Sequence, residues 1–344
     1  MELSRREFIN RMGLAAGGYG LAGILPNMLT AGNVDQRKFT FELSLAQFSF
    51  ASELFSGNMS MFDFPQRAVN EFGINTLEYV SGFFNNKHLD PVFMKELKSI
   101  CNDLGAKNHL IMVDAENIAS LDPAIRKKAV EGHYSWIDAA KYLDCDAIRV
   151  NFGDTMAALT GKAEEGTPEE VAKAAADGYN SLLEYAEKAE IHVIVENHFG
   201  YSTDPDWLIG ILSQVPSSFK GLLPDFGNFC LERSKPDGAD LKSLINTTCL
   251  REYDRYEGVK KMMPYSKGVS AKTHRFDAEG NDLDTDFFKM FELIKASGWS
   301  GGYVGIEYEG GLMRDLGGDQ SYLPNDQGIL ATKKLLEKVL AELG

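Results

Sequence analysis

The chain has 344 residues, of which 44% are hydrophobic and 25% are charged, and this ordinary globular composition excludes an intrinsically disordered polymer. Its formal net charge of −15 would repel polyanions, so neither nucleic acid nor an anionic membrane surface is an expected partner. The four cysteines are Cys101, Cys145, Cys230 and Cys249. Their wide spacing without a CxxC pair argues against a disulfide framework and leaves a single isolated pair open.

The first 35 residues differ from the rest of the chain. Arg5 and Arg6 precede Phe8, and residues 12–25 form a mildly apolar run that is rich in glycine and alanine and has no acidic residue. This pattern resembles a twin-arginine export signal over residues 1–35, so we predict an exported, periplasmic protein. The run is too short and too rich in glycine to span a membrane, so no anchor is expected after the signal is removed. An amphipathic helix that begins the fold is the alternative interpretation.

Residues 36–344 are predicted as one domain in which short apolar runs alternate with segments of helical periodicity. The predicted strands are 41–50, 74–80, 109–113, 147–152, 192–197, 221–226, 268–272 and 303–308. Eight strand–helix units favour a closed (β/α)₈ TIM barrel, which is an α/β fold with parallel strands. An open doubly wound sheet is the alternative, but that fold requires no count of eight, and no GxGxxG motif follows the first strand.

Capping residues indicate where the helices between these strands begin. Helices are predicted over 91–104, 168–188, 285–297 and 327–343. Thr167, which precedes a proline and two glutamates, is typical of a helix start, and Asp284 is predicted to cap the helix that follows it. The long segment 230–267 is expected to contain a loop over the barrel mouth and a helix.

The last four predicted strands each lead into an acid or a histidine: Glu196, Asp225, His274 and Glu307. The carboxyl ends of the strands build the active site in (β/α)₈ barrels, so these side chains are expected to meet. A carboxylate beside aliphatic strand residues is costly to desolvate, and a divalent cation offsets that cost directly. Three carboxylates with an imidazole suit Mn²⁺, Zn²⁺, Mg²⁺ or Co²⁺. Any one of these residues alone is better interpreted as a surface residue or helix cap, but four consecutive strands favour a metal site.

Four stretches of the C-terminal half carry a resemblance to a known family. They are Val-Glu-Asn-His at 195–198, Pro-Asp-Phe-Gly-Asn at 224–228, Ser-Ala-Lys-Thr-His at 270–274 and Gly-Ile-Glu-Tyr-Glu-Gly at 305–310. They resemble the xylose isomerase-like TIM-barrel superfamily, which contains sugar isomerases and epimerases and shares its fold with endonuclease IV. The resemblance implies a divalent metal ion held by Glu196, Asp225, a residue of the seventh strand and Glu307.

The seventh strand departs from the family pattern. Family members often carry His-x-Lys-Asp there, with the histidine as a ligand, and the corresponding position in this chain is Ser270. His274 lies four residues further on with the same strand parity, so it is our candidate for the fourth ligand, and the choice between it and Ser270 stays open. A site of three carboxylates alone, or one that uses Lys272, is the alternative. A second departure follows Asp225, because Asn228 stands where some epimerases have a substrate-contacting histidine.

The same resemblance implies a metal-dependent sugar isomerase or epimerase that acts on a keto-sugar or a related carbohydrate through an enediolate intermediate. Glu196 and Glu307 would be metal ligands and also the acid–base pair, and Lys272 would stabilise the enediolate oxygen. A salt bridge to a neighbouring acid is the alternative role for Lys272. The candidates for substrate binding are His198, Asn228, Arg149 and Glu78.

Other functions remain open at this point. A metal-assisted lyase or hydrolase could use the same enolising chemistry on an oxidised keto glycoside. A non-catalytic periplasmic sugar-binding barrel is an alternative from a different class. DNA repair by analogy with endonuclease IV is disfavoured by the acidic charge and the export signal. The sequence does not reveal which sugar or which metal is bound, nor whether the protein forms a homo-oligomer.

Overall fold

The computed structural model describes residues 38–344 except 116, 154–165, 239, 241 and 244–245. The predicted export signal at 1–35 lies outside the described residues, as does most of the connection between the fourth strand and the helix at 168. The barrel itself is formed by the unit Phe39–Gly344.

Parallel strands form one eight-stranded sheet in the order β6-β5-β4-β3-β2-β1-β10-β9. The strands are β1 (Glu42–Ala46), β2 (Thr76–Val80), β3 (Lys107–Met112), β4 (Ala147–Val150), β5 (His192–Glu196), β6 (Lys220–Leu223), β9 (Val269–Thr273) and β10 (Tyr303–Tyr308). Parallel bridges from Leu222 to Ser266 and from Asp225 to Ser270 join the two outer strands of this order, so the sheet closes on itself. The predicted (β/α)₈ barrel is therefore confirmed, and the open sheet is excluded.

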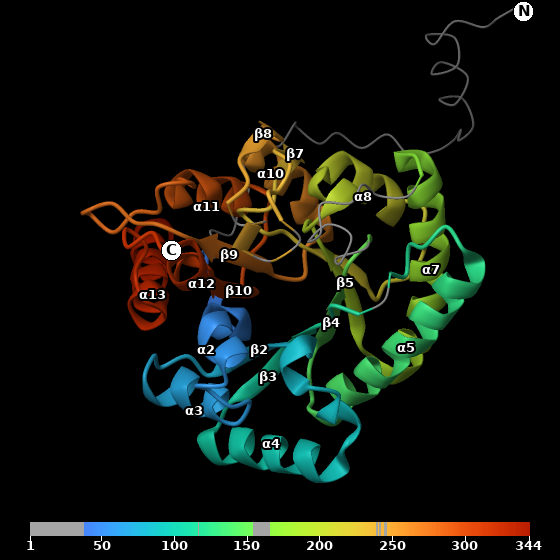
Figure 1. Cartoon of the computed structure of the whole chain (residues 1–344), viewed down its shortest axis with the longest axis horizontal. Coiled ribbons are helices and arrows are strands. Elements are labelled where there is room, and N and C mark those ends of the chain that lie inside the picture. Colours follow the sequence, from blue (N-terminus) through green and yellow to red (C-terminus); the bar gives the residue numbers. More distant parts are fainter. Residues whose placement is uncertain (1–37, 116, 154–165, 239, 241, 244–245) are drawn as a thin grey trace, which may run out of the picture. The chain divides into compact units, whose positions relative to one another are not determined.

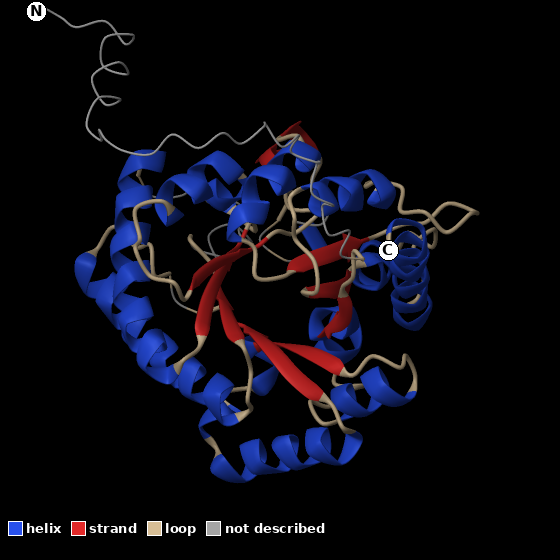
Figure 2. Ribbon diagram, turned by 180° about the vertical axis from the view of Figure 1, so that it is seen from behind, coloured by secondary structure: helices blue, strands red, loops and turns tan. Residues whose placement is uncertain are grey.

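Helices surround the ring of strands (Figures 1 and 2). They are α2 (Ala51–Ser56), α3 (Asp63–Asn70), α4 (Pro91–Leu104), α5 (Pro123–Tyr142), α7 (Pro168–Ala189), α8 (Pro205–Leu212), α10 (Arg255–Met262), α11 (Phe287–Ala296), α12 (Gly310–Gly317) and α13 (Asn325–Leu343). Short 3₁₀ helices are η1 (Gln47–Phe50), η2 (Ser81–Phe84), η3 (Lys87–Leu89), η4 (Gly200–Thr203) and η5 (Met263–Tyr265). Across the described ranges, no helix is long and apolar enough to cross a bilayer.

Local sequence explains several helix boundaries. α4 begins after Asp90, whose carboxylate accepts hydrogen bonds from two backbone amides of the first turn, and it ends at Gly105 in a left-handed conformation. α7 begins with a full capping box between Thr167 and Glu170. α11 begins after Asp286 and not after Asp284, because it is Asp286 that accepts a bond from the amide of Lys289. The prediction that Asp284 caps this helix is therefore wrong.

Several predicted strands are longer than the observed ones, the first and the sixth among them. The first ends at Ala46, because the chain continues as η1, in which Gln47, Ser49 and Phe50 are buried without extending the ladder. The sixth ends at Leu223, because Pro224 has no backbone N–H to donate to a neighbouring strand. The chain nevertheless continues beside β9, where the Ser270 amide donates to the Pro224 carbonyl. This continuation brings Asp225 and Ser270 together.

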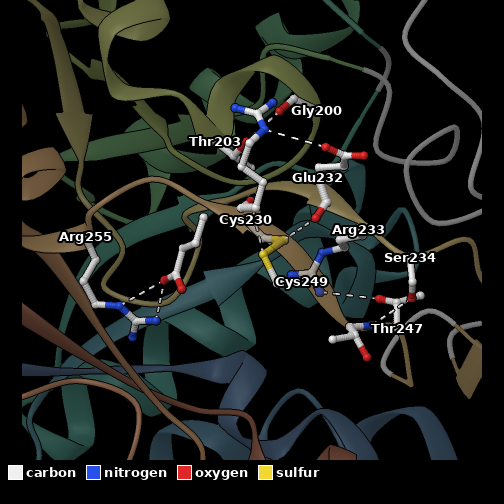
Figure 3. The surroundings of a disulfide bond; sticks show 12 residues. Gly200, Thr203, Cys230, Glu232, Arg233, Ser234, Thr247, Cys249 and Arg255 are labelled. Atoms are coloured by element: carbon white, nitrogen blue, oxygen red, sulfur yellow. Dashed lines mark hydrogen bonds and ion pairs between the residues drawn. A yellow bond between two sulfur atoms is a disulfide. The ribbon is translucent and has the colours of Figure 1, made fainter.

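The segment between Asp225 and α10 contains an antiparallel hairpin of β7 (Cys230–Arg233) and β8 (Cys249–Glu252). A disulfide between Cys230 and Cys249 links the two strands covalently (Figure 3). It is the isolated pair that cysteine spacing left open, while Cys101 and Cys145 are free and buried.

Candidate functional site

Three buried carboxylates meet at the carboxyl ends of the strands. Glu196 ends β5, Asp225 follows β6, and Glu307 lies in β10, and one oxygen of each lies within 4.8 Å of the others. Their residues are 2%, 0% and 5% exposed. Among the residues that the structure describes, no other group of three or more histidine, cysteine, aspartate or glutamate side chains has this geometry. The group has the donor chemistry to hold a divalent cation.

Lys272 of β9 places its ammonium against this group. Its Nζ lies 3.6 Å from Asp225 Oδ2, 3.5 Å from Glu307 Oε2 and 2.9 Å from Glu309 Oε1. Burial lowers the pKa of Lys272, but the surrounding carboxylates outweigh this effect and hold the pKa well above its usual range. Lys272 is therefore a fixed positive charge beside two of the three carboxylates.

Arg149 of β4 supplies a second buried positive charge. Its Nε lies 2.9 Å from Glu196 Oε2, and its Nη1 lies 2.5 Å from Asp114 Oδ1. Burial lowers the pKa of this guanidinium, but Asp114 and Glu196 outweigh that effect, so Arg149 stays charged. Together Lys272 and Arg149 set two positive charges against the five carboxylates that they contact. The site thus keeps a strong negative excess when its acids are ionised.

The protein environment opposes ionisation of the two glutamates in the group. Burial raises the pKa of Glu196 well above its usual range; Arg149 opposes this shift, and the carboxylates of Asp225 and Glu307 add to it. Burial likewise raises the pKa of Glu307 to about 7, against the effect of Lys272. A cation bound between these oxygens would stabilise their ionised forms.

One carboxylate oxygen of the group lacks a hydrogen-bond partner. Glu196 Oε2 is buried and faces Arg149 Nε at ion-pair distance, but neither atom makes a hydrogen bond. A buried acceptor without a hydrogen bond is costly unless something else compensates it. This oxygen without a hydrogen bond and the negative excess of the site together fit a divalent cation.

Ser270 of β9 lies between two of the carboxylates. Its Oγ is 2.7 Å from Asp225 Oδ2 and 2.9 Å from Glu307 Oε2, and the residue is 1% exposed. The backbone bridge between Asp225 and Ser270, which closes the barrel, sets this position.

Sequence comparison agrees with this architecture. The sequence model of one family, the xylose isomerase-like TIM barrel, matches residues 66–338. The chain belongs to the xylose isomerase-like TIM barrel family. No curated protein matches the chain.

Solved structures of similar fold cover most of the chain. An L-ribulose 3-epimerase is 14% identical with a TM-score of 0.62, over 88% of this chain and 96% of its own. A xylose isomerase-like TIM barrel protein from Mycobacterium smegmatis in complex with magnesium is 16% identical with a TM-score of 0.60, over 89% and 98%. A 3-keto-D-glucoside 4-epimerase from E. coli is 13% identical with a TM-score of 0.56, over 88% and 100%. At these identities the likeness shows the fold alone.

Within the xylose isomerase-like barrel, the structure separates His274 from the three carboxylates. β9 ends at Thr273, so the strand parity on which the prediction depended does not extend to residue 274. The imidazole instead lies 3.4 Å from Glu309 Oε2 and 3.7 Å from Asp284 Oδ2. Of the two candidates for a fourth ligand, Ser270 contacts two of the carboxylates, whereas the ring of His274 contacts Glu309 and Asp284.

Two of the predicted substrate-binding residues contact other polar groups at the barrel mouth. Asn228 donates from Nδ2 to Glu196 Oε1 at 3.1 Å, and its Oδ1 accepts from Lys272 Nζ at 3.4 Å. His198 is partly buried, with Nδ1 3.1 Å from Asn151 Oδ1. Burial lowers the pKa of His198 to about 3, with help from nearby cations, so its imidazole is neutral. Asn228, through its two hydrogen bonds, positions Glu196 and Lys272 relative to each other.

The other two predicted substrate-binding residues, Arg149 and Glu78, are buried inside the barrel. Arg149 is 3% exposed and pairs with acids, as described above. Glu78 is 2% exposed, and its Oε1 accepts a 2.5 Å hydrogen bond from Ser44. Gly305 allows this packing, because a Cβ at that position would lie 2.8 Å from the Glu78 carboxylate. Burial raises the pKa of Glu78.

Two residues of the site were missed by sequence reasoning. Asp114 follows β3 and holds both Arg149 and Asn151. Asn197 is fully buried, accepts from the Asp225 amide at 2.8 Å and donates to the Asp225 carbonyl at 3.0 Å. Both stand at strand ends after an apolar run, which is the same signal that identified the carboxylates. Asp114 follows the third strand and not one of the last four, and Asn197 is neither an acid nor a histidine, so neither was singled out.

Proposed function

We propose that the protein is a metal-dependent enzyme that enolises a keto-sugar or a related carbohydrate, as an isomerase or epimerase. The observation that carries the proposal is the group of three buried carboxylates with Lys272 and Arg149 beside it, at the barrel end where active sites lie. The named epimerases among the similar structures support it. The acidic net charge speaks against DNA repair, as does the finding that the described residues form one cluster of three possible metal ligands and no larger one.

Glu196, Asp225 and Glu307 would hold the cation. A divalent cation bound there would polarise a carbonyl and the neighbouring hydroxyl, and this would acidify the C–H bond of the hydroxyl-bearing carbon next to the carbonyl. Asn197 fixes the backbone of Asp225 from both its amide and its carbonyl, which keeps that ligand in place.

Proton transfer is assigned to the two glutamates. Glu196 and Glu307 stand on β5 and β10, which are not neighbours in the sheet, so their carboxylates approach the site from different sides. One removes a proton from the substrate carbon and the other returns a proton to the opposite face. Burial raises the pKa of Glu307 in the absence of a cation, and a bound cation would lower it again, so Glu307 would act as an ionised base.

Lys272 would stabilise the negative oxygen of the enediolate. Its ammonium is buried, charged and already next to Glu307, so no reorganisation is needed when charge develops on the substrate. Arg149 and Asn228 contact the two oxygens of Glu196 and hold its carboxylate in one orientation.

We also propose that the N-terminal segment directs export to the periplasm. The disulfide between Cys230 and Cys249 supports this, because such bonds persist in oxidising compartments. Cell fractionation tests it, and an entirely cytosolic protein would refute it.

Solvent deuterium exchange tests the enzymatic proposal. The protein, loaded with Mn²⁺ or Mg²⁺, is incubated in D₂O with a panel of ketoses and 3-keto-glycosides, and carbon-bound deuterium is measured by NMR. We expect uptake into at least one sugar, lost in Glu196→Gln and in Glu307→Gln and retained in Glu184→Gln, which changes an exposed glutamate of α7. Uptake with release of a substituent would identify a lyase or hydrolase. Sugar binding without any uptake would instead identify a binding protein.

A further inference from the structure

The Ser270 hydroxyl lies where a fourth ligand would complete the group of three carboxylates. Its Oγ is 2.7 Å from Asp225 Oδ2 and 2.9 Å from Glu307 Oε2. Neighbouring oxygens of an octahedral shell are about 3 Å apart when the metal–oxygen distance is about 2.1 Å. The distances from the Ser270 hydroxyl to these two carboxylate oxygens are therefore close to the distance between neighbouring ligands of one metal ion.

No histidine or cysteine belongs to the group in the part of the chain that the structure describes. The ring of His274 faces Glu309 at 3.4 Å, and that of His198 faces Asn151 at 3.1 Å. Two of the four cysteines are joined in the disulfide, and the other two do not belong to the group. The donors that converge on this point are all oxygens.

A second observation points to a ligand independently of the acidic cluster. Glu196 Oε2 belongs to a residue that is 2% exposed, and this oxygen makes no hydrogen bond. The neighbouring guanidinium of Arg149 lies 2.9 Å away without the orientation of a hydrogen bond. This oxygen therefore has a positive neighbour but no hydrogen-bond donor on its lone pairs.

We infer that the centre takes a hard divalent cation, Mg²⁺ or Mn²⁺, through an all-oxygen set formed by Glu196, Asp225, Glu307 and the Ser270 hydroxyl. This inference rests on the metal dependence in the proposed function. Carboxylate and hydroxyl oxygens suit Mg²⁺ and Mn²⁺, whereas imidazole and thiolate ligands increase the preference for Zn²⁺ and Co²⁺. Serine at position 270 therefore sets the metal preference of this chain.

Competition between Mn²⁺ and Zn²⁺ tests the inference without any activity measurement. Metal-free protein is titrated with Mn²⁺, the free ion is followed by electron paramagnetic resonance, and Zn²⁺ is added as competitor. Zn²⁺ binds most sites more tightly than Mn²⁺, so the ratio of the two dissociation constants is the quantity to compare among variants. Ser270→Cys replaces the hydroxyl oxygen with a sulfur atom, which is a softer donor. Ser270→Ala, which removes the donor atom, is the matched control.

In Ser270→Cys we expect the ratio to shift towards Zn²⁺ by at least about tenfold, because a thiolate joins the ligand set. In Ser270→Ala we expect weaker Mn²⁺ binding with little change in the ratio. If Mn²⁺ binds the wild type, is lost in Asp225→Asn, and the ratio does not change in a folded Ser270→Cys protein, the serine is outside the ligand set and the inference fails. Failure of every divalent cation to bind the wild type would instead overturn the proposed metal dependence.

A measurement on the wild type removes any dependence on how the variants fold. Pulsed electron paramagnetic resonance of the Mn²⁺-loaded protein detects nitrogen nuclei that are bonded to the ion. We expect no coupling from a directly coordinated imidazole nitrogen. Such a coupling would place His198 or His274 in the ligand set and would overturn the all-oxygen assignment.

Discussion

Two sides of the barrel mouth have different chemistry. On one side, the ends of β5, β6, β9 and β10 carry the three carboxylates and Lys272. On the other side, β1 and β2 lead into η1 and η2, which place Phe48 and Phe83 beside the exposed Phe55 of α2. The centroids of these three rings are 5.2 to 6.4 Å apart. The same fold thus presents a charged side and an aromatic side on the face where its strands end.

A cavity of about 510 Å³ lies on the aromatic side. It is lined mainly by apolar side chains of α2, of the turn at 57–62 and of η2, with Phe55 and Phe83 among them. We expect the charged side to carry out the chemistry and the aromatic side to contact the apolar face of a bound carbohydrate.

The largest effect is expected from Asp225→Asn on the charged side. Removing one carboxylate of the three should abolish metal binding and lower kcat/KM by at least about a thousandfold, since several kcal/mol of charge stabilisation are lost. The matched control is Asp146→Asn, which pairs with His109 and Lys107 beside the opposite ends of the strands. Retention of metal and activity in Asp225→Asn would show that the charged side is not the reaction centre.

A smaller loss is expected from Lys272→Met. The metal should still bind, while kcat falls by about a hundredfold, because one preorganised stabiliser of developing charge is removed. KM should change little. Lys98→Met is the control, because Lys98 also makes an ion pair, 2.6 Å from Asp144, but lies on the outer helix α4. If Lys272→Met lost only stability and kept its kcat, Lys272 would be a structural ion-pair partner.

The smallest effect is expected from Phe55→Ala on the aromatic side. Phe55 is 61% exposed, so its removal should leave the thermal midpoint unchanged. KM should rise by less than about tenfold at constant kcat, because only some apolar contact with the substrate is lost. Tyr142→Ala, at the far end of α5, is the aromatic control. An unchanged KM would show that the aromatic side does not bind the substrate. A lower kcat would show that the aromatic side also takes part in the chemistry.

Sequence periodicity predicted the barrel well because each strand is an apolar run of limited length. β10 matches its predicted range of 303–308. The first strand was predicted too long, because burial alone does not distinguish a strand from a buried 3₁₀ helix such as η1. Glu196, Asp225 and Glu307 could be named from sequence because a carboxylate at the end of an apolar strand is costly to bury without a cation or a hydrogen-bond partner.

Other features depend on distances that sequence does not contain. His274 has the parity of Ser270 in sequence, but β9 ends one residue before it, and the chain then turns towards Asp282. The disulfide depends on a hairpin that brings together two cysteines 19 positions apart. Sequence does not single out the aromatic side, because most phenylalanines in any barrel belong to the core.

Anomalous diffraction tests the metal centre most directly. A crystal of the wild-type protein grown with Mn²⁺ is measured at the manganese edge. We predict one strong anomalous peak within about 2.0–2.5 Å of oxygens from Glu196, Asp225 and Glu307. Density without an anomalous peak at this position, in crystals that contain Mn²⁺, would contradict the assignment of these three carboxylates as the metal centre.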